Sequence, residues 1–517
     1  MEIESEKGNI LKINQTNLEN TDLTTKYLME NLDKTLIMFC NPISGNQEGK
    51  IFLHLGNHYL TKEKYKLIDF QYLLTNKKYE PIKVVFFELI DKEDLAKGHL
   101  LLKNFILKCK LNIEMGYEEK FQRVKTLIAG GDGTILSTID NFVKDGIDLN
   151  YCIFGHVPLG TGNDLAKTLG FSNHINISET NINKLYKVLH RYYIARFGRI
   201  DVWKMDLQLD PIDGKVLVNT KDGKFPIKDD KGNIIKNYVR SFINYVSLGY
   251  DARIGYNFDR RRTTSRNGNK CIYVIEGLKK IFCNKTLAVQ NFIETFTVYD
   301  NLDNSFNQES FFSDKDHEND INITNNNINA SHNNLNANEH KVKFRCMTKK
   351  TFLSNKEKMN DKCLVFKGKP CSIIFQNIVN YMSGVENMWG KGKQRLTVGV
   401  KNGTEIENEK YTQKLREMAK SKQRFDDKML EVFTFDNGFE TGLEKLIRGL
   451  AKKVYHGRGP MEVKFLDTPK YEKDNTNNRI YLNLDGEYFH IVKPILMRIE
   501  LNRDYCGGQL PFLIGDI

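Results

Sequence analysis

The stretch from Thr126 to Thr134, with the sequence TLIAGGDGT, decides the fold of this chain. It begins with an apolar run typical of a buried strand, and apolar side chains recur at helical spacing just beyond it. The glycines let the backbone approach phosphate oxygens closely, and Asp132 can bind a metal ion or activate water. A helix start behind them offers free N–H groups to an anion. The stretch predicts a strand, a turn and a helix around a nucleotide polyphosphate; a turn that needs glycine only for packing is the alternative.

Two other predicted strands end in similar turns. Residues 151–154 lead into PLGTGNDLA at 158–166, and residues 36–40 lead into NPISGN at 41–46. A capped helix start without any ligand, at Asn163 or Asp164, is the alternative interpretation of the first of these turns. Three such turns at the ends of strands nevertheless favour a ligand site, because open α/β sheets bind ligands at their carboxyl edge.

The pattern divides the chain into two folded parts. Between residues 34 and 198, predicted strands alternate with helices, which is typical of a Rossmann-like parallel sheet covered on both faces and is the expected nucleotide-binding domain. From residue 199 to 500, short strands and Asp-Gly or Asn-Gly turns indicate an antiparallel β-sandwich. Four segments stand apart, namely an N-terminal extension at 1–33, an inserted hairpin at 206–238, a disordered asparagine-rich insert at 300–342 and a C-terminal tail at 501–517.

Composition agrees with two domains in a chain of 517 residues. Hydrophobic residues make up 40% and charged residues 27%, and no apolar run approaches the ~20 residues of a membrane span. The start of the sequence lacks the apolar region of a signal peptide and the glycine needed for myristoylation, so a cytoplasmic protein is expected. The nine cysteines show no zinc-ligand spacing.

The formal net charge of +12 suits an anionic partner, either a membrane surface or a nucleic acid. Basic residues gather between Arg253 and Lys285, although a solvated face is the alternative for Lys279, Lys280 and Lys285. No aromatic-interleaved nucleic-acid module is visible. We therefore expect peripheral contact with an anionic membrane and no nucleic acid.

The three turns, in this order, resemble the catalytic region of diacylglycerol kinases, within the superfamily that also holds NAD kinases and phosphofructokinases. GGDGT alone fits all of these enzymes, whereas GTGNDLA points to the diacylglycerol kinase branch. Later segments resemble the family patterns NYxSxGxDA, SRxxNK, NI…GGxxxWG, DGxLEV and VDGE, at residues 244–252, 265–270, 377–390, 426–432 and 484–487. The resemblance spans most of residues 34–500 and implies a phosphofructokinase-like first domain followed by a lipid-substrate domain.

The resemblance also implies which residues bind ATP and Mg²⁺. Backbone and hydroxyl donors of the three turns would hold ATP, at Asn41, Ser44, Gly45, Gly130, Gly131, Gly133, Thr134, Gly160, Thr161, Gly162 and Asn163. Three carboxylates, Asp132, Asp164 and Asp201, would organise Mg²⁺ directly or through water. Asp201 is included because RIDVW at 199–203 resembles the family's LDxW segment; a strand-edge carboxylate is the alternative.

Catalysis would fall to Asp132, Asp485 and Glu487. The last two lie two residues apart, so on an extended chain both carboxylates point to one side. One of them would take the proton of the lipid hydroxyl, and the sequence leaves open which one. A hairpin turn without a catalytic role is the alternative for both.

The sequence therefore predicts an ATP-dependent kinase that phosphorylates 1,2-diacylglycerol to phosphatidic acid at a membrane surface. Such Mg²⁺-assisted in-line transfer depends mainly on positioning and on neutralising phosphate charge. A sphingoid or ceramide kinase is the alternative enzyme, and a NAD kinase would leave the later motifs unexplained. A lipid-sensing pseudokinase is the non-catalytic alternative, disfavoured because every expected carboxylate is present. Acyl-chain preference, regulation, the membrane visited and the oligomeric state stay open.

Overall fold

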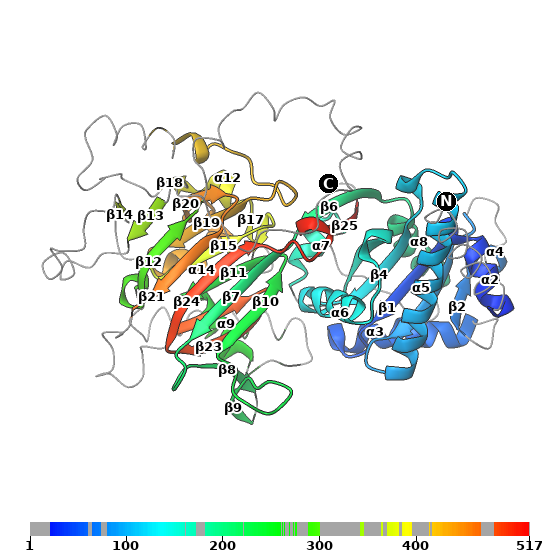
Figure 1. The fold of residues 1–517 in the computed structure, drawn as a ribbon, viewed down its shortest axis with the longest axis horizontal. Helices are drawn as coiled ribbons and strands as arrows, with labels where there is room; N and C mark the ends of the chain where they lie inside the picture. The colour runs from blue at the N-terminus through cyan, green and yellow to red at the C-terminus, as the bar shows by residue number, and fades with distance from the viewer. Residues whose placement is uncertain are drawn as a thin grey trace, which may run out of the picture.

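The computed structural model describes residues 21–59, 65–73, 80–160, 162–171, 181–220, 222–259, 288–299, 342–345, 363–365, 370–381, 385–394, 416–466 and 480–515, with isolated residues between them. A helix-covered sheet formed mainly by the first part of the chain lies beside two sheets formed by the rest (Figure 1). The disorder expected at 300–342 concerns residues outside the described ranges, apart from Val342, and stays a prediction.

The first sheet has seven strands in the order β2-β3-β1-β4-β5-β25-β6. Their bounds are β1 Thr35–Cys40, β2 Lys66–Asp69, β3 Lys83–Glu88, β4 Val124–Gly130, β5 Cys152–Pro158, β6 Arg196–Asp201 and β25 Gln509–Ile514. The five central strands are parallel, while β2 and β6 run antiparallel at the two edges. A mostly parallel α/β sheet, as predicted from the alternation of strands and helices, is confirmed.

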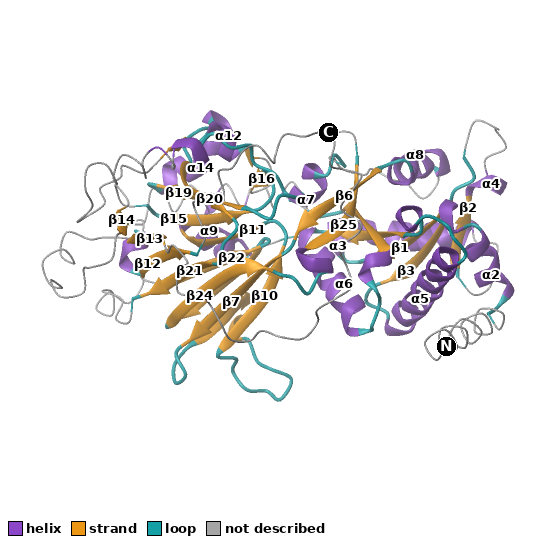
Figure 2. Cartoon of the chain, turned by 45° about the horizontal axis from the view of Figure 1, so that its top comes forward, coloured by secondary structure: helices purple, strands orange, loops and turns teal. Residues whose placement is uncertain are grey.

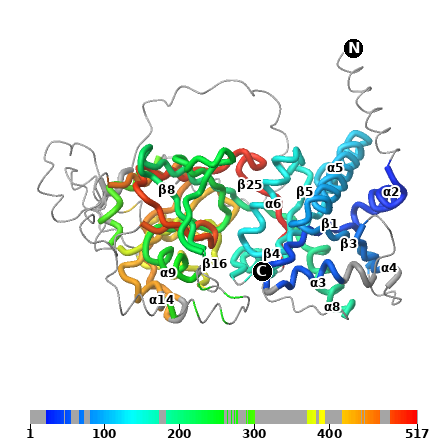
Figure 3. The backbone as a smooth tube through the Cα atoms, turned by 90° about the horizontal axis from the view of Figure 1, so that it is seen from below, coloured from blue at the N-terminus to red at the C-terminus, as the bar shows by residue number. Residues whose placement is uncertain are grey.

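Helices cover both faces of this sheet. Figure 3 shows α5 and α6 on one side and α3 and α8 on the other. The helices are α2 Leu23–Glu30, α3 Ser44–Tyr59, α4 Phe70–Leu73, α5 Lys92–Glu114, α6 Asp132–Lys144, α7 Asp164–Thr168 and α8 Ile182–Tyr193. Strand β1 is buried along its whole length, as a strand covered on both faces must be.

Both segments expected to lie outside the domains contribute to this part. In the N-terminal extension, α2 buries Leu28, and Tyr27 donates a hydrogen bond to Asp69 of β2 at 2.6 Å. The segment 501–517, expected as a tail, supplies β25 to the interior of the sheet instead. Phe512 is fully buried there against Phe154 of β5, because its apolar side chain fills the gap between β5 and β6.

The second part holds two mainly antiparallel sheets. The first has the order β10-β7-β24-β21-β12-β13-β14, with bounds β7 Trp203–Leu209, β10 Asn237–Phe242, β12 Ile293–Val298, β13 Val342–Arg345, β14 Cys363–Val365, β21 Met461–Phe465 and β24 Pro494–Leu501. Figure 2 shows β10, β7, β24 and β21 side by side. Only the β13–β14 pair of this sheet is parallel among the described strands.

The other sheet has the order β18-β20-β19-β15-β11-β22-β23-β8-β9. Its bounds are β8 Lys215–Thr220, β9 Gly223–Pro226, β11 Tyr245–Gly249, β15 Ser372–Gln376, β18 Lys393–Gln394, β19 Leu430–Phe435, β20 Lys452–Gly457, β22 Ile480–Leu484 and β23 Glu487–Val492. The short strands β16 Asn380–Tyr381 and β17 Val385–Glu386 pair separately, and helices α9 Tyr250–Asp259, α12 Met388–Lys391 and α14 Gly438–Ile447 complete the described elements.

The two sheets pack face to face around one apolar core. Phe296 of β12 contacts Phe375 of β15 with ring centroids 5.6 Å apart, and Tyr238 of β10 contacts Phe489 of β23 at 5.4 Å. The predicted antiparallel sandwich is therefore confirmed. Of the inserted hairpin expected at 206–238, strands β8 and β9 do pair as a hairpin at the edge of their sheet, whereas residues 206–209 belong to β7, which lies inside its sheet and buries alternate side chains in this core.

Within the described residues, no helix combines the length and the apolar character needed to cross a membrane.

Candidate active site

Two of the glycine turns touch each other at the carboxyl edge of the first sheet. Strand β4 ends at Gly130, Gly131 precedes α6, and Asp132 opens that helix. A Cβ placed on Gly160 would lie 2.8 Å from the Cα of Gly131, and one on Gly130 would lie 2.5 Å from the hydroxyl of Thr134. Gly160 is required because a side chain there would meet the backbone of the other turn, and Gly130 because a side chain there would meet the side chain of Thr134.

The carboxylate of Asp132 joins the two turns. Its Oδ2 accepts a hydrogen bond from the backbone N–H of Asp164 at 2.8 Å, and its Oδ1 accepts one from Leu165 at 3.3 Å. Burial raises the pKa of Asp132 to about 6, against the opposing effect of these two donors. The same side chain that was predicted to bind metal and to catalyse therefore also caps the first turn of α7.

The third turn closes over the other two. Its Asn41 donates a backbone hydrogen bond to Ala129 at 2.9 Å, and the side-chain amide reaches the hydroxyl of Thr134 at 3.5 Å. Gly45, which follows Ser44 in this turn, has a positive φ of +63°. A Cβ there would lie 2.2 Å from the carbonyl oxygen of Leu159, so the turn depends on glycine.

The predicted ATP-binding residues thus gather at one edge of the sheet, as far as they are described. Asn163, in the left-handed conformation, donates to the carbonyl of Gly160 at 2.8 Å. A Cβ on Gly162 would lie 3.8 Å from Oδ2 of Asp132. Thr161 lies outside the described residues. The assignment of these residues to ATP stays a prediction.

The three predicted metal ligands are not brought together as one group. Asp164 is 2% exposed, and its backbone N–H is one of the two donors to Asp132. Its carboxylate lies 3.8 Å from the ammonium of Lys167. Asp201, which is fully buried, instead accepts from Gln509 at 2.7 Å and from the backbone of Lys428 at 2.5 Å. No cluster of three or more His, Cys, Asp or Glu side chains in the described ranges is arranged to hold a metal ion.

Asp201 has a visible structural reason for this position. It is the last residue of β6, and its two oxygens fasten that strand to β25 and to the chain that enters β19. Burial raises its pKa to about 7, and the nearby carboxylates of Asp427 and Asp426 act in the same direction. The alternative of a strand-edge carboxylate, left open from the sequence, therefore describes its contacts well.

The Asp-Gly-Glu segment forms a tight turn between β22 and β23, as its Asp-Gly sequence predicts, and not the extended chain on which both carboxylates would point to one side. Asp485 and Gly486 both have positive φ, at +48° and +87°, as the central residues of such a hairpin turn require. Asp485 accepts three backbone hydrogen bonds, from Ile243 at 2.8 Å and from Asn244 and Tyr245 at 2.9 Å each. Burial raises its pKa to about 7 in spite of these donors.

Glu487 has different surroundings. Its side chain is 46% exposed and lies 3.2 Å from the guanidinium of Arg240. A Cβ on Gly133 would lie 3.5 Å from its Oε1, so the carboxylate reaches the first turn of α6 in the other part of the molecule. Of the two predicted bases, Asp485 is held in a backbone cradle and Glu487 is open to solvent.

Two further contacts fix α7 against the second part. The hydroxyl of Tyr245 lies 3.5 Å from Oδ2 of Asp164, and the amide of Asn380 donates to the hydroxyl of Thr168 at 3.0 Å. Sequence reasoning named Tyr245 only as part of a motif and missed Asn380, Thr168 and Arg240. Their roles depend on contacts between distant segments, and the only sequence signal was the NYxSxGxDA pattern.

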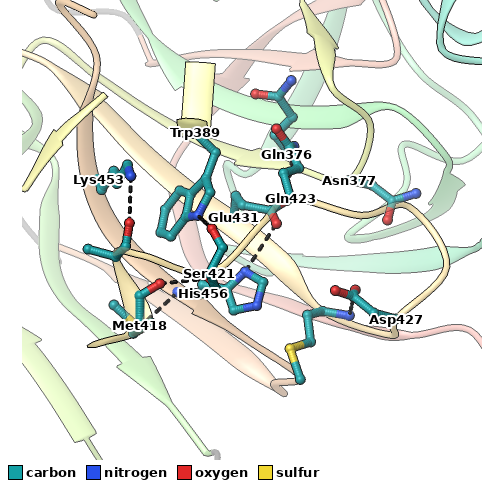
Figure 4. Close-up of polar contacts among 12 residues, drawn as sticks. Gln376, Asn377, Trp389, Met418, Ser421, Gln423, Asp427, Glu431, Lys453 and His456 are labelled. Atoms are coloured by element: carbon teal, nitrogen blue, oxygen red, sulfur yellow. Dashed lines mark hydrogen bonds and ion pairs between the residues drawn. The ribbon is translucent and has the colours of Figure 1, made fainter. Parts of the chain in front are cut away.

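A polar network surrounds Glu431 in the second part of the chain (Figure 4). Glu431, fully buried, accepts from His456 and from Gln423, each at 3.0 Å. The ring of Trp389 packs 5.6 Å from that of His456, and its indole N–H donates to Ser421 at 2.8 Å. Glu431, in the segment that resembles DGxLEV, and Trp389, in the segment that resembles WG, thus belong to one interior cluster, whereas Asp426 and Asp427 are half-buried and Lys428 is exposed.

Asn377, next to Gln376 of β15, connects the end of β6 to the segment that holds the Asp-Gly-Glu turn. Its amide donates to the carbonyls of Asp201 at 3.0 Å and Ile243 at 2.7 Å, and its oxygen accepts from Trp203 at 3.2 Å. Ile243 in turn donates its N–H to Asp485. One buried amide therefore fixes both the end of β6 and the cradle of the Asp-Gly-Glu turn.

The basic stretch from Arg253 to Lys285 is only partly described. Arg253, at its start, is 8% exposed, so it does not offer its charge to a membrane. Arg261 pairs with Glu276 at 2.8 Å. Most of the other basic residues of the stretch lie outside the described ranges.

Comparisons with known proteins agree with this division of the chain. The model of the diacylglycerol kinase catalytic domain matches residues 35–191, and that of the diacylglycerol kinase accessory domain matches residues 241–488. Diacylglycerol kinase 3 of Arabidopsis thaliana is 30% identical over 155 residues, which are 28% of this chain and 31% of the relative. Diacylglycerol kinase 7 of the same plant is 26% identical over 240 residues, 44% of either protein.

Diacylglycerol kinase zeta of Rattus norvegicus is 31% identical over 164 residues, which are 30% of this chain and 15% of the relative. The matched region is thus less than half the length of each of these three relatives. A solved structure from Bacillus anthracis covers 94% of this chain and 99% of its own, with a TM-score of 0.38 and 10% identity, values too low to carry an argument. With catalytic and accessory regions matched in order, the chain belongs to the diacylglycerol kinase family.

Proposed function

We propose that this chain is an ATP-dependent kinase that phosphorylates 1,2-diacylglycerol to phosphatidic acid. Family membership supports a kinase of this type. The observation that carries the proposal is the approach of Glu487, in the accessory region, to Gly133 in the glycine turn. In-line phosphoryl transfer requires a phosphate donor on one side and an acceptor hydroxyl, with a group to take its proton, on the other. The glycine turn would hold the donor, and the carboxylate that faces it would take the proton.

ATP would lie on the three turns at the carboxyl edge of the first sheet. The backbone of Gly130–Thr134 and the start of α6 suit its phosphates, because Gly131 places no side chain over the first helical turn. Asn41, Ser44 and Gly45 would close one side, and Gly160, Thr161, Gly162 and Asn163 the other. The contact between Gly131 and Gly160 leaves the two backbones close enough to share one ligand.

Asp132 and Asp164 suit Mg²⁺, which in proteins takes one or two carboxylates together with water and phosphate oxygens. Each retains acceptor capacity beyond the hydrogen bonds described. When bound, the ion would neutralise charge on the phosphates. Asp201, whose oxygens already accept from Gln509 and Lys428, would act on it only through water.

A carboxylate of the Asp-Gly-Glu turn would take the proton of the lipid hydroxyl. The lipid hydroxyl oxygen would form a bond to the γ-phosphorus while the bond from that phosphorus to the bridging oxygen of ADP breaks. Glu487 is our candidate to receive the hydroxyl proton, because it is exposed and lies against the α6 turn. Asp485, with an elevated pKa and three backbone donors, would position the turn and is the second candidate.

The test is phosphorylation of a lipid panel by the purified full chain. Labelled ATP and Mg²⁺ are supplied with vesicles that contain an anionic lipid and diacylglycerol, monoacylglycerol, sphingosine or ceramide. We also propose that the chain acts as a cytoplasmic protein that binds the membrane peripherally. We expect labelled phosphatidic acid. Glu487→Gln should abolish most of it, while Glu462→Gln, another arginine-paired carboxylate in the accessory region, should not. Labelling only of sphingosine or ceramide, or of no lipid, would refute the substrate assignment.

A further inference from the structure

Arg240 holds a position that no family motif explains. It lies on β10, and its side chain is 41% exposed. One guanidinium nitrogen lies 3.2 Å from Oε2 of Glu487, and another donates to the hydroxyl of Tyr238 at 3.3 Å. The guanidinium also lies 5.9 Å from the centre of the Tyr238 ring, which is buried. Both terminal nitrogens of the guanidinium are therefore held by neighbouring side chains, while the side chain remains 41% exposed to solvent.

The charge around Arg240 is mainly negative. Burial lowers its pKa, but Tyr238 and the carboxylates of Glu487, Asp140 and Asp485 act more strongly in the other direction and raise it. Asp132 and Asp164 lie beyond them at the glycine turns. A nucleotide with several negative charges needs cations in such surroundings, and a guanidinium suits the planar, two-pronged recognition of phosphate oxygens.

The distances place Arg240 on the acceptor side of the phosphate-binding turn. Glu487 contacts the position of Gly133 with one carboxylate oxygen and Arg240 with the other. A phosphoryl group that leaves the α6 turn for a hydroxyl beside Glu487 must therefore pass within reach of the guanidinium.

We propose that Arg240 is a catalytic residue that contacts the phosphoryl group during transfer. The inference rests on the proposed kinase function. Arg240 forms no covalent bond and moves no proton: the phosphorus exchanges its bond to ADP for one to the lipid oxygen, and the carboxylate takes the proton. The guanidinium donates hydrogen bonds to the equatorial phosphoryl oxygens, over which negative charge is spread in the transition state.

The first experiment compares Arg240→Met with Arg498→Met. Arg498 is a matched control, because it is 40% exposed and pairs with Glu462 and Glu500 in the same sheet, away from the glycine turns. Arg240→Met should lower kcat by ~10²-fold with KM for either substrate within about threefold, since a donor aimed at developing charge acts mainly in the transition state. Arg240→Lys should recover only part, and Arg498→Met should retain wild-type kcat.

A second comparison separates contact with phosphate from support of Glu487. If Arg240 only positions Glu487, Arg240→Met should cost nothing further in a Glu487→Gln enzyme. We expect instead a further loss of at least ~10-fold in single-turnover rate with labelled ATP. Additional loss supports the proposal, whereas an unchanged rate in the double variant overturns it.

A binding measurement keeps this inference distinct from the proposed substrate. ADP, Mg²⁺ and aluminium fluoride together mimic a phosphoryl group in transfer, and calorimetry measures their binding without lipid. We expect Arg240→Met to weaken the fluoride-dependent binding by ~10-fold or more and to leave ADP binding alone unchanged. If the enzyme is inert toward diacylglycerol but shows this difference in binding, the substrate assignment is refuted and the role of Arg240 is supported. Equal fluoride-dependent binding by wild type and Arg240→Met would refute the role of Arg240.

Discussion

The two carboxylates of the Asp-Gly-Glu turn should respond differently to the same chemical change. Asp485→Asn replaces one oxygen of a carboxylate that accepts three backbone hydrogen bonds. In its best orientation the amide keeps Oδ1, which serves Asn244 and Tyr245, and turns its NH₂ group toward the N–H of Ile243. Glu487→Gln removes only a half-exposed contact with Arg240.

The expected magnitudes follow from these contacts. Hydrogen bonds to a charged group contribute ~1.5–3 kcal/mol each, and an unpaired buried donor costs ~1–3 kcal/mol. Loss of the Ile243 bond, together with weakening of the other two, should therefore lower the free energy of unfolding of Asp485→Asn by ~3–6 kcal/mol at pH 8. An exposed ion pair contributes under about 1 kcal/mol, so Glu487→Gln should unfold like the wild type.

Urea unfolding at pH 8 and at pH 5.5, followed by circular dichroism, is the measurement. The gap between Asp485→Asn and wild type should widen at pH 5.5, because burial raises the pKa of Asp485 from 3.8 to about 7. The folded wild type then binds a proton at pH 5.5 that its unfolded chain does not, which stabilises it, whereas Asn does not titrate. Equal stability of Asp485→Asn and wild type at pH 8 would refute the view that this carboxylate organises the turn.

Three other results are expected. Tyr245→Phe removes only the hydroxyl that faces Asp164 and leaves the backbone N–H that donates to Asp485. We expect kcat to fall ~3- to 10-fold and the free energy of unfolding to stay within about 1 kcal/mol of wild type. An unchanged kcat would exclude a positioning role for this hydroxyl. Asn377→Ala leaves three buried partners without their hydrogen bonds and should lower the free energy of unfolding in urea by ~3–6 kcal/mol. The control Asn150→Ala, whose hydrogen bonds are exposed, should lower it by under ~1 kcal/mol. Similar losses in both variants would refute the view that Asn377 fixes the end of β6 and the Asp-Gly-Glu turn. Since burial raises the pKa of Asp485 to about 7, its carboxylate is lost as pH falls through that value, so kcat should decline below about pH 7; a flat profile from pH 5.5 to 8.5 would show that Asp485 does not need its charge.

Local patterns predicted the first sheet well. The strands expected at 36–40, 126–129 and 151–154 match β1, β4 and β5. These strands are buried on both faces and are separated by amphipathic helices, so their signal lies within short windows of sequence. The three glycine turns followed because each sits at the end of such a strand.

The features that sequence reasoning missed depend on pairing between distant segments. QLPFLI at 509–514 is a short apolar run with no helix partner, and nothing local shows that it enters a sheet formed mostly by the first part of the chain. Likewise, Asp485 and Glu487 look equivalent in sequence. Only the packing of their turn against Ile243–Tyr245 and Arg240 makes one a buried anchor and the other an exposed carboxylate.

Strand β25 has a consequence for how the molecule is made. The hydrogen bond between Gln509 and Asp201 joins residues 308 positions apart. The sheet that carries the glycine turns therefore lacks its interior strand β25 until the ribosome has translated residues 509–514. At roughly 5–20 residues per second, a ribosome needs ~15–60 s to cross that interval. During this time the side of β5 that later pairs with β25 is open to chaperones or to other nascent chains. In sequence, the accessory region lies between β6 and β25 of the first sheet, so that sheet is completed only after the accessory region has been synthesised.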